Sequence, residues 1–257
     1  MSDDDAIENV LILQGGGSLG AFGCGVFKAL ANNNIKIDIV AGTSIGGVNA
    51  SIIAGAKQDH PEKALEQYWL ELAEGNVDMN LEFPLVKEDK SSEHQVDMSS
   101  TEHTQMTHIS QINSSISFYF SAIYGNRKVF MPRWRPEYAL TDPKYFVPHE
   151  WTYLFDHSPL IKTLEKFVDF NKLKPAGQSN SRLIITAVNV LTAEPLIFDS
   201  SKQQITPKHI LATTGYPRYY FRWVEVEKGV YAWDGSLLSN TPLREVIDVS
   251  PIKDKKI

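Results

Sequence analysis

Two strand–glycine–helix junctions near the start of the chain constrain the fold more than any other feature. Residues 10–13 and 35–41 are continuous apolar runs, and each is followed by a glycine-rich turn, at 15–20 and 42–47. After each turn, apolar residues recur at helical spacing, over 21–30 and 48–54. Continuous apolar runs are typical of strands that a parallel sheet buries on both faces. The sequence therefore predicts a three-layer α/β fold with a mainly parallel central sheet.

The remaining pattern extends this domain to the end of the chain. It predicts helices over 61–74 and from Ser158 onward, strands over 183–190 and 196–198, a hairpin over 223–233, and a last helix from Thr241. Prolines argue against regular structure in 125–138. Residues 87–117 are rich in Ser, Thr, His and Gln without a sustained period, which indicates a polar flexible insertion. We expect a single domain over residues 1–257.

Charge and cysteine content exclude several classes of protein. The 25 basic and 31 acidic side chains give a net charge of −6, which argues against a general nucleic-acid binder. Cys24 is the only cysteine and cannot form an intrachain disulfide, and the first residues lack the apolar region of a secretory signal, so we expect a cytoplasmic protein. The spacing of His94, His103 and His108 places no matched pair on one helical face, so we expect no metal and no cofactor.

The second turn contains a candidate nucleophile. Gly42, Thr43, Ser44, Ile45 and Gly46 form the pattern G-x-S-x-G between a predicted strand and a predicted helix. In that context a sharp turn holds the serine hydroxyl outside the sheet, and the two glycines let the flanking backbones approach closely. The helix that follows points its positive end at Ser44 and favours negative charge there. The alternative is an ordinary turn with a capping serine.

The first turn is a candidate anion site. Consecutive glycines at 15, 16 and 17 let the backbone present N–H groups to an anion without a Cβ in the way. One candidate anion is the oxyanion of an acyl-transfer intermediate. The other is a pyrophosphate, because Gly15, Gly17 and Gly20 also satisfy the dinucleotide pattern G-x-G-x-x-G. Asp38 has nearly the separation that a ribose-binding carboxylate requires, but it falls within the second predicted strand.

A serine nucleophile needs a base, and the histidines are poorly placed in sequence to supply one. All seven precede Asp234, whereas the usual order of an α/β-hydrolase puts a histidine after the acid. Asp234 itself follows an apolar strand and precedes Gly235, as expected for an acid presented at a sheet edge. A carboxylate acting directly on Ser44 would need a raised pKa, which partial burial can supply. The alternative is an aspartate that opens a turn.

Taken together, GGGSLG, GTSIG and the Asp-Gly pair at 234–235 resemble the patatin-like phospholipases, which are serine acyl hydrolases with a Ser-Asp dyad. SPLIKTLEKFVDF, RLIITAVNV and DGSLLSNTPL are also similar to a bacterial and archaeal patatin subgroup whose oxyanion loop carries leucine. The resemblance implies Ser44 as nucleophile, Asp234 as base and a carboxylic ester of a lipid as substrate. It implies an oxyanion hole formed by the backbone of Gly15, Gly16 and Gly17. It also implies that Gly42 and Gly46 support the turn at Ser44 and that Gly20 and Gly235 complete the motifs.

Two departures from the family keep other functions open. Leu19 stands where the wider family has arginine, and the chain stops soon after Pro251, where relatives continue, which indicates a trimmed chain or a short member. A polyester depolymerase or thioesterase would use the same dyad, and a catalytically weak lipid-binding module is the non-enzyme alternative. The aromatic and basic residues of 118–135 favour either ordinary packing or peripheral contact with a membrane.

Overall fold

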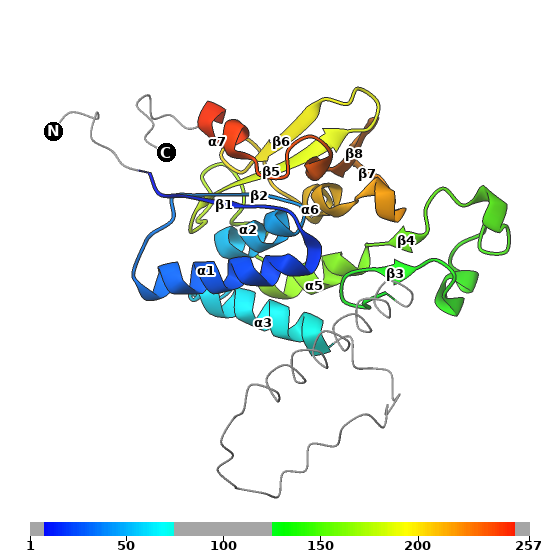
Figure 1. Ribbon diagram of the computed structural model, residues 1–257, viewed down its shortest axis with the longest axis horizontal. Helices are drawn as coiled ribbons and strands as arrows, with labels where there is room; N and C mark the ends of the chain where they lie inside the picture. Colours follow the sequence, from blue (N-terminus) through cyan, green and yellow to red (C-terminus); the bar gives the residue numbers. More distant parts are fainter. Residues whose placement is uncertain (1–7, 75–124, 250–257) are drawn as a thin grey trace, which may run out of the picture.

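A six-stranded mixed sheet forms the centre of the computed structural model, which describes residues 8–74 and 125–249 (Figure 1). Its central strands β1 (Val10–Leu13), β2 (Ile39–Thr43) and β5 (Arg182–Asn189) are parallel. Strands β6 (Pro195–Asp199), β7 (Val224–Glu227) and β8 (Val230–Asp234) pair antiparallel with their neighbours. The parallel centre was predicted because each of its strands is a continuous apolar run.

Helices cover both faces of this sheet, as a three-layer fold requires. One face carries the larger core and five helices, namely α1 (Gly20–Asn32), α2 (Ile45–Gly55), α3 (Pro61–Glu74), α5 (Pro159–Phe167) and α6 (Pro207–Thr214). The opposite face carries α7 (Leu243–Val249), which packs on a smaller cluster through Val246 (Figure 1). Helix α2 lies against the sheet and is buried along most of its length because its side chains are small or apolar.

A smaller module lies between α3 and α5 in the chain and is drawn in green in Figure 1. It contains the short antiparallel pair β3 (Met131–Pro132) and β4 (Phe155–Asp156), with 3-10 turns between them. The prolines that argued against regular structure limit these elements to two residues each. The predicted insertion at 87–117 and part of the aromatic segment 118–135 lie outside the described residues.

Two predictions about the elements were wrong. The second strand begins at Ile39 rather than at residue 35, because the N–H of Ile35 bonds to the carbonyl of Leu30 and closes the end of α1. Asp38 therefore precedes β2 instead of lying within it. Helix α6 was not predicted, although Thr206 caps it and Pro207 occupies its first turn. This helix matters because its last turn reaches the candidate site.

Candidate active site

The pairing of β5 brings two distant parts of the chain together at one place. On one edge of β5, β2 pairs with the strand up to Thr186, and β8 pairs from Ala187 onward. Strand β6 pairs with residues on both sides of that boundary, so it occupies the other edge. Strands β2 and β8 therefore meet end to end. Since β2 ends at Thr43 and β8 ends at Asp234, Ser44 and Asp234 become neighbours despite their separation in sequence.

Ser44 lies on a strained turn between β2 and α2. Its backbone has φ 56° and ψ −130°, a conformation that non-glycine residues rarely adopt and that costs about 1–3 kcal/mol. The turn is so tight that a Cβ on Gly42 would lie 2.2 Å from the backbone of Gly46. A Cβ on Gly46 would lie 2.0 Å from the carbonyl oxygen of Leu13. Both glycines are therefore required by close backbone approach, as the sequence pattern predicted.

Asp234 is buried beside Ser44. The residue is 1% exposed, and its Oδ1 accepts a 2.9 Å bond from the Ser236 N–H. Burial raises the pKa of Asp234 above its ordinary value, although the nearby N–H of Ser236 and the hydroxyls of Ser44 and Ser236 partly offset this. A raised pKa makes the carboxylate a better proton acceptor. The fold thus places a hydroxyl near a carboxylate whose basicity its environment increases.

The glycine turn after β1 lies against Ser44. A Cβ on Gly15 would be 3.0 Å from the Cβ of Ser44, so the two segments are in contact. The N–H of Gly15 donates to the Asn240 carbonyl at 3.1 Å and is not free to bind an oxyanion. Gly16 and Gly17 have φ values of 154° and 58°, and neither N–H donates to another group in the described part of the chain. These two N–H groups remain as candidate oxyanion donors.

Two further glycines permit close packing around the site. A Cβ on Gly20 would lie 2.6 Å from Ile45, in the first turn of α2. A Cβ on Gly235 would lie 2.5 Å from the carbonyl oxygen of Thr186. Gly20 therefore lets α1 begin close to the serine turn, and Gly235 lets the chain after Asp234 stay close to β5.

Sequence reasoning missed the threonines that hold the serine turn. The Ser44 N–H donates to the Thr213 hydroxyl at 2.8 Å, and that hydroxyl donates to the Thr186 carbonyl at 2.7 Å. The hydroxyls of Thr43 and Thr186 lie 2.6 Å apart. Thr213 belongs to the last turn of α6, and the carbonyl of Gly215, just beyond, accepts from the Asp234 N–H at 3.1 Å. A polar Thr213 on an otherwise apolar helix stretch was the available signal.

None of the histidines in residues 8–74 and 125–249 hydrogen-bonds to Ser44 or Asp234. Nε2 of buried His157 bonds to the Leu211 carbonyl, and Nδ1 of buried His209 accepts from the Thr206 N–H. Burial lowers the pKa of His157, and it lowers that of His209 to about 4. Each ring therefore stays neutral near pH 7. His209 bonds at the beginning of α6 and His157 bonds to its last turn, so both rings stabilise this helix.

The structure does not place Asp38 where the dinucleotide alternative requires a carboxylate. Asp38 precedes β2, at the opposite end of the strand from Ser44, and its carboxylate accepts from the Asn9 N–H at 3.0 Å and pairs with Lys36. A ribose-binding acid is needed at the carboxyl end of that strand.

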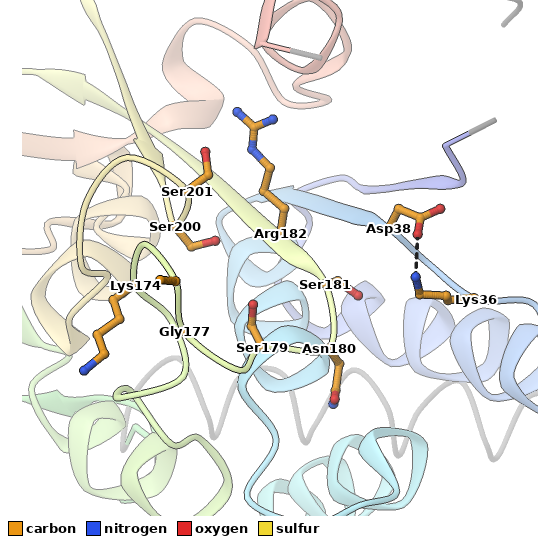
Figure 2. Close-up of a pocket in the computed structure, with 11 residues that line it drawn as sticks. Lys36, Asp38, Lys174, Gly177, Ser179, Asn180, Ser181, Arg182, Ser200 and Ser201 are labelled. Carbon is orange, nitrogen blue, oxygen red and sulfur yellow. Dashed lines mark ion pairs between the residues drawn. The ribbon is translucent and has the colours of Figure 1, made fainter. Parts of the chain in front are cut away.

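Figure 2 shows a separate pocket of about 300 Å³ at the amino ends of β2 and β5. Its polar lining includes Lys36, Asp38, Lys174, Ser179 and Arg182. The charges there are largely satisfied, since Lys36 pairs with Asp38 and Arg182 forms two bonds to the buried carboxylate of Asp199. This pocket lies at the other end of the strands from Ser44, so it is not part of the candidate active site.

Comparison with known proteins decides the family. A family model described as patatin-like phospholipase matches residues 11–247, nearly the whole chain. The chain belongs to the patatin-like phospholipase family. This family match also accounts for the observed fold, in which both glycine motifs follow parallel strands.

Two other comparisons are less informative about this patatin-like phospholipase. No curated protein matches it. Among solved structures it is similar to VipD from Legionella pneumophila, with 16% identity and a TM-score of 0.47 over 91% of this chain. The chain spans about half of that structure, 47% of its length.

Neither a metal-binding cluster nor a membrane-spanning helix is found within residues 8–74 and 125–249 of this family member. No group of three or more His, Cys, Asp or Glu side chains within those ranges is arranged to hold a metal ion. No helix within them is long and apolar enough to span a bilayer. The histidines at 94, 103 and 108 lie outside them, and the cytoplasmic location stays a prediction.

Proposed function

We propose that the protein is a serine lipid acyl hydrolase that cleaves carboxylic esters through Ser44 and Asp234. The single observation that carries the proposal is that β2 and β8 meet end to end on β5, which places Ser44 next to the buried carboxylate of Asp234 and beside the glycine turn. The family match supports lipid hydrolysis as the general activity. Asp234 also opens the 3-10 turn at Gly235–Leu237, since its Oδ1 accepts from the Ser236 N–H. Capping that turn does not require burial next to a strained serine, and this juxtaposition favours the catalytic interpretation of both residues.

The proposed reaction passes through an acyl-serine. As Ser44 Oγ attacks the ester carbonyl, its proton moves to the Asp234 carboxylate, and the carbonyl oxygen becomes an oxyanion. The N–H groups of Gly16 and Gly17 stabilise that oxyanion, and the positive end of α2 lowers the energy of charge beside Ser44. The tetrahedral intermediate collapses, Asp234 returns the proton to the departing alkoxide, and the alcohol leaves. Water then attacks the acyl carbon as Asp234 takes its proton, and Asp234 returns that proton to Ser44 Oγ as the bond between Oγ and the acyl carbon breaks. This releases the carboxylic acid and regenerates Ser44.

Thr213 has a positioning role in this scheme. By accepting from the Ser44 N–H it fixes the backbone of the nucleophile, and by donating to Thr186 it ties that turn to β5. Because the Ser44 N–H is engaged in this way, it is not available as an oxyanion donor. One lost oxyanion donor typically lowers turnover by about 10²- to 10³-fold.

The proposal does not specify the acyl group or the leaving group of the substrate. A polyester depolymerase or thioesterase would use the same two residues, and the lipid class rests on the family match rather than on a substrate pocket. The weak lipid-binding module is disfavoured by the strained serine, since φ 56° at Ser44 serves no purpose in a passive surface.

Labelling with a fluorophosphonate tests the proposal, because only an activated serine reacts readily. We expect wild-type protein to be labelled at Ser44 and to hydrolyse short acyl esters, with Ser44→Ala losing both activities. Asp234→Asn keeps the size of the side chain but removes the base, so we expect a loss of at least about 10³-fold in ester turnover.

Ser179→Ala, in the pocket at the other end of the sheet, is the matched serine control and should behave as wild type. Wild-type protein that is not labelled, or Ser44→Ala protein that keeps its esterase activity, would refute the proposal. A fully active Asp234→Asn variant would remove Asp234 as the base.

A further inference from the structure

Two exposed segments next to Ser44 carry protruding apolar side chains. In the segment that leads from the glycine turn into α1, Leu19 is 72% and Phe22 is 80% exposed. In the segment that follows Asp234, Leu237 is 41% and Leu238 is 54% exposed. Isolated exposed leucines are common on proteins, but here four large apolar side chains occur on two segments that both adjoin one site.

Hydrogen bonds join these two segments beside the nucleophile. The Gly15 N–H donates to the Asn240 carbonyl at 3.1 Å, and the Asn240 side chain donates to the Gly15 carbonyl at 3.3 Å. Gly15 in turn touches Ser44. The four side chains, Leu19, Phe22, Leu237 and Leu238, therefore lie on two joined segments that both adjoin Ser44. We call this set the apolar rim.

The segments that carry the apolar rim have no charge. Residues 14–27 and 235–243 contain no Asp, Glu, Lys, Arg or His, in a chain of which 22% is charged. Attraction to an anionic membrane normally uses several lysines or arginines close to the surface. Arg218 and Arg222, which follow α6, are exposed cations on a third segment, and Lys28 and Arg244 stand just beyond the two uncharged ranges. The rim thus matches an electrically neutral surface rather than a strongly charged one.

We propose that the apolar rim docks onto the surface of uncharged or zwitterionic lipid, so that the enzyme acts on lipid in aggregate. This inference rests on the proposed function. A lipid surface fits the position of the rim, because an ester at that surface can pass directly to Ser44. A protein partner seated on the same four side chains would close the entrance instead. Leucine and phenylalanine side chains enter the boundary between headgroups and acyl chains, where their apolar surface leaves water.

Sedimentation with vesicles tests the inference, using the full chain with Ser44→Ala so that the lipid stays intact. We expect binding to phosphatidylcholine vesicles that changes little between about 0.05 and 0.5 M NaCl or on addition of phosphatidylserine. Leu19→Ser with Phe22→Ser, and separately Leu237→Ser with Leu238→Ser, should each weaken partitioning by about tenfold or more. Thermal melting of each variant checks that the protein remains folded.

The matched control is Val10→Ser with Ile35→Ser. These side chains are 38% and 43% exposed and lie at the amino-end side of the sheet, away from Ser44. We expect this variant to bind vesicles as the parent does. The inference fails if the parent does not bind neutral vesicles, if rim variants bind normally, or if the control loses binding equally. It also fails if binding requires phosphatidylserine and disappears in salt.

Two results would distinguish lipid docking from dimerisation through the rim and from the proposed hydrolysis. A concentration-dependent dimer that the rim substitutions abolish would assign the rim to a second copy of the chain and overturn lipid docking. Neutral vesicle binding that depends on the rim, together with wild-type protein that fluorophosphonate does not label, would refute the proposed hydrolysis and leave the docking surface standing.

Discussion

The catalytic role that we propose for Asp234 and the effect of this residue on stability oppose each other. Because burial raises its pKa above the ordinary value of 3.8, the folded protein holds that proton more tightly than the unfolded chain does. The free energy of unfolding must therefore decrease as the pH rises from the unfolded value through the raised folded value. Above that range the folded protein carries the full cost of a buried negative charge, and the proposed activity requires this charged form.

Asp234→Asn should consequently stabilise the protein near pH 7 while abolishing activity. Asparagine can still accept from the Ser236 N–H, and its amide can donate to Ser44, so the expected gain is about 0.5–2 kcal/mol, or about 1–8 °C in Tm. The gain should shrink as the pH falls towards 3.8, because Asp234 itself is then neutral in both states.

Thermal melts of wild type and variant across this pH range give the comparison, with exposed Asp248→Asn as the control. A variant that melts below wild type at pH 7, or gains equally at every pH, would contradict the expected cost of the buried charge.

Residue patterns predicted the residues of the candidate site better than they predicted the residues that hold them in place. Ser44, Asp234 and the first glycine turn were found because each has a local signature of residue types. Asn240 has none and Thr213 has only a weak one, its polarity on an apolar helix stretch, since their roles come from hydrogen bonds to residues far away in sequence. The sequence also did not show that the Gly15 N–H is occupied, because its acceptor is 225 residues away.

At the scale of elements, the turn between β2 and α2 should tolerate no added atom. Gly46→Ala would place a Cβ 2.0 Å from the Leu13 carbonyl oxygen, and backbone of β1 cannot move without disturbing the sheet. We expect a loss of at least about 4 kcal/mol in the free energy of unfolding, or no folded protein.

Gly25→Ala is the matched control for that substitution. Gly25 lies within α1, and a Cβ there would meet no atom within 4 Å. Because alanine has the higher helix propensity, this variant should be more stable by about 0.5–1 kcal/mol. Urea unfolding of both variants measures the difference. Equal stability of the two would show that the turn at Ser44 is looser than the structure indicates.

Element boundaries followed the sequence where local signals were strong. Helix α3 begins at Pro61 and ends at Glu74 as predicted, since proline and an apolar stripe define it. Strand β2 starts late and α6 was missed, because a hydrogen bond to α1 and burial against the sheet decided those boundaries. The end-to-end arrangement of β2 and β8 could not be predicted, since strand pairing depends on the whole sheet.

At the scale of the molecule, one sheet joins both ends of the described chain through a shared core. We propose on this basis that the chain folds as a single domain, and we expect one cooperative thermal transition. Far-UV and near-UV circular dichroism should therefore report the same Tm. Two separated transitions would indicate that the module around β3 and β4 unfolds independently of the sheet.

The meeting of β2 with β8 also has a consequence for synthesis in the cell. A ribosome makes the residues around Ser44 well before the carboxylate that would activate it, because Asp234 lies far along the chain from the serine. Nascent chains and proteolytic fragments that lack β8 would contain the nucleophile without its base. The proposed hydrolase would thus become active only after β8 has been translated and paired with β5, and a partly made chain would spare the membranes of the cell that makes it.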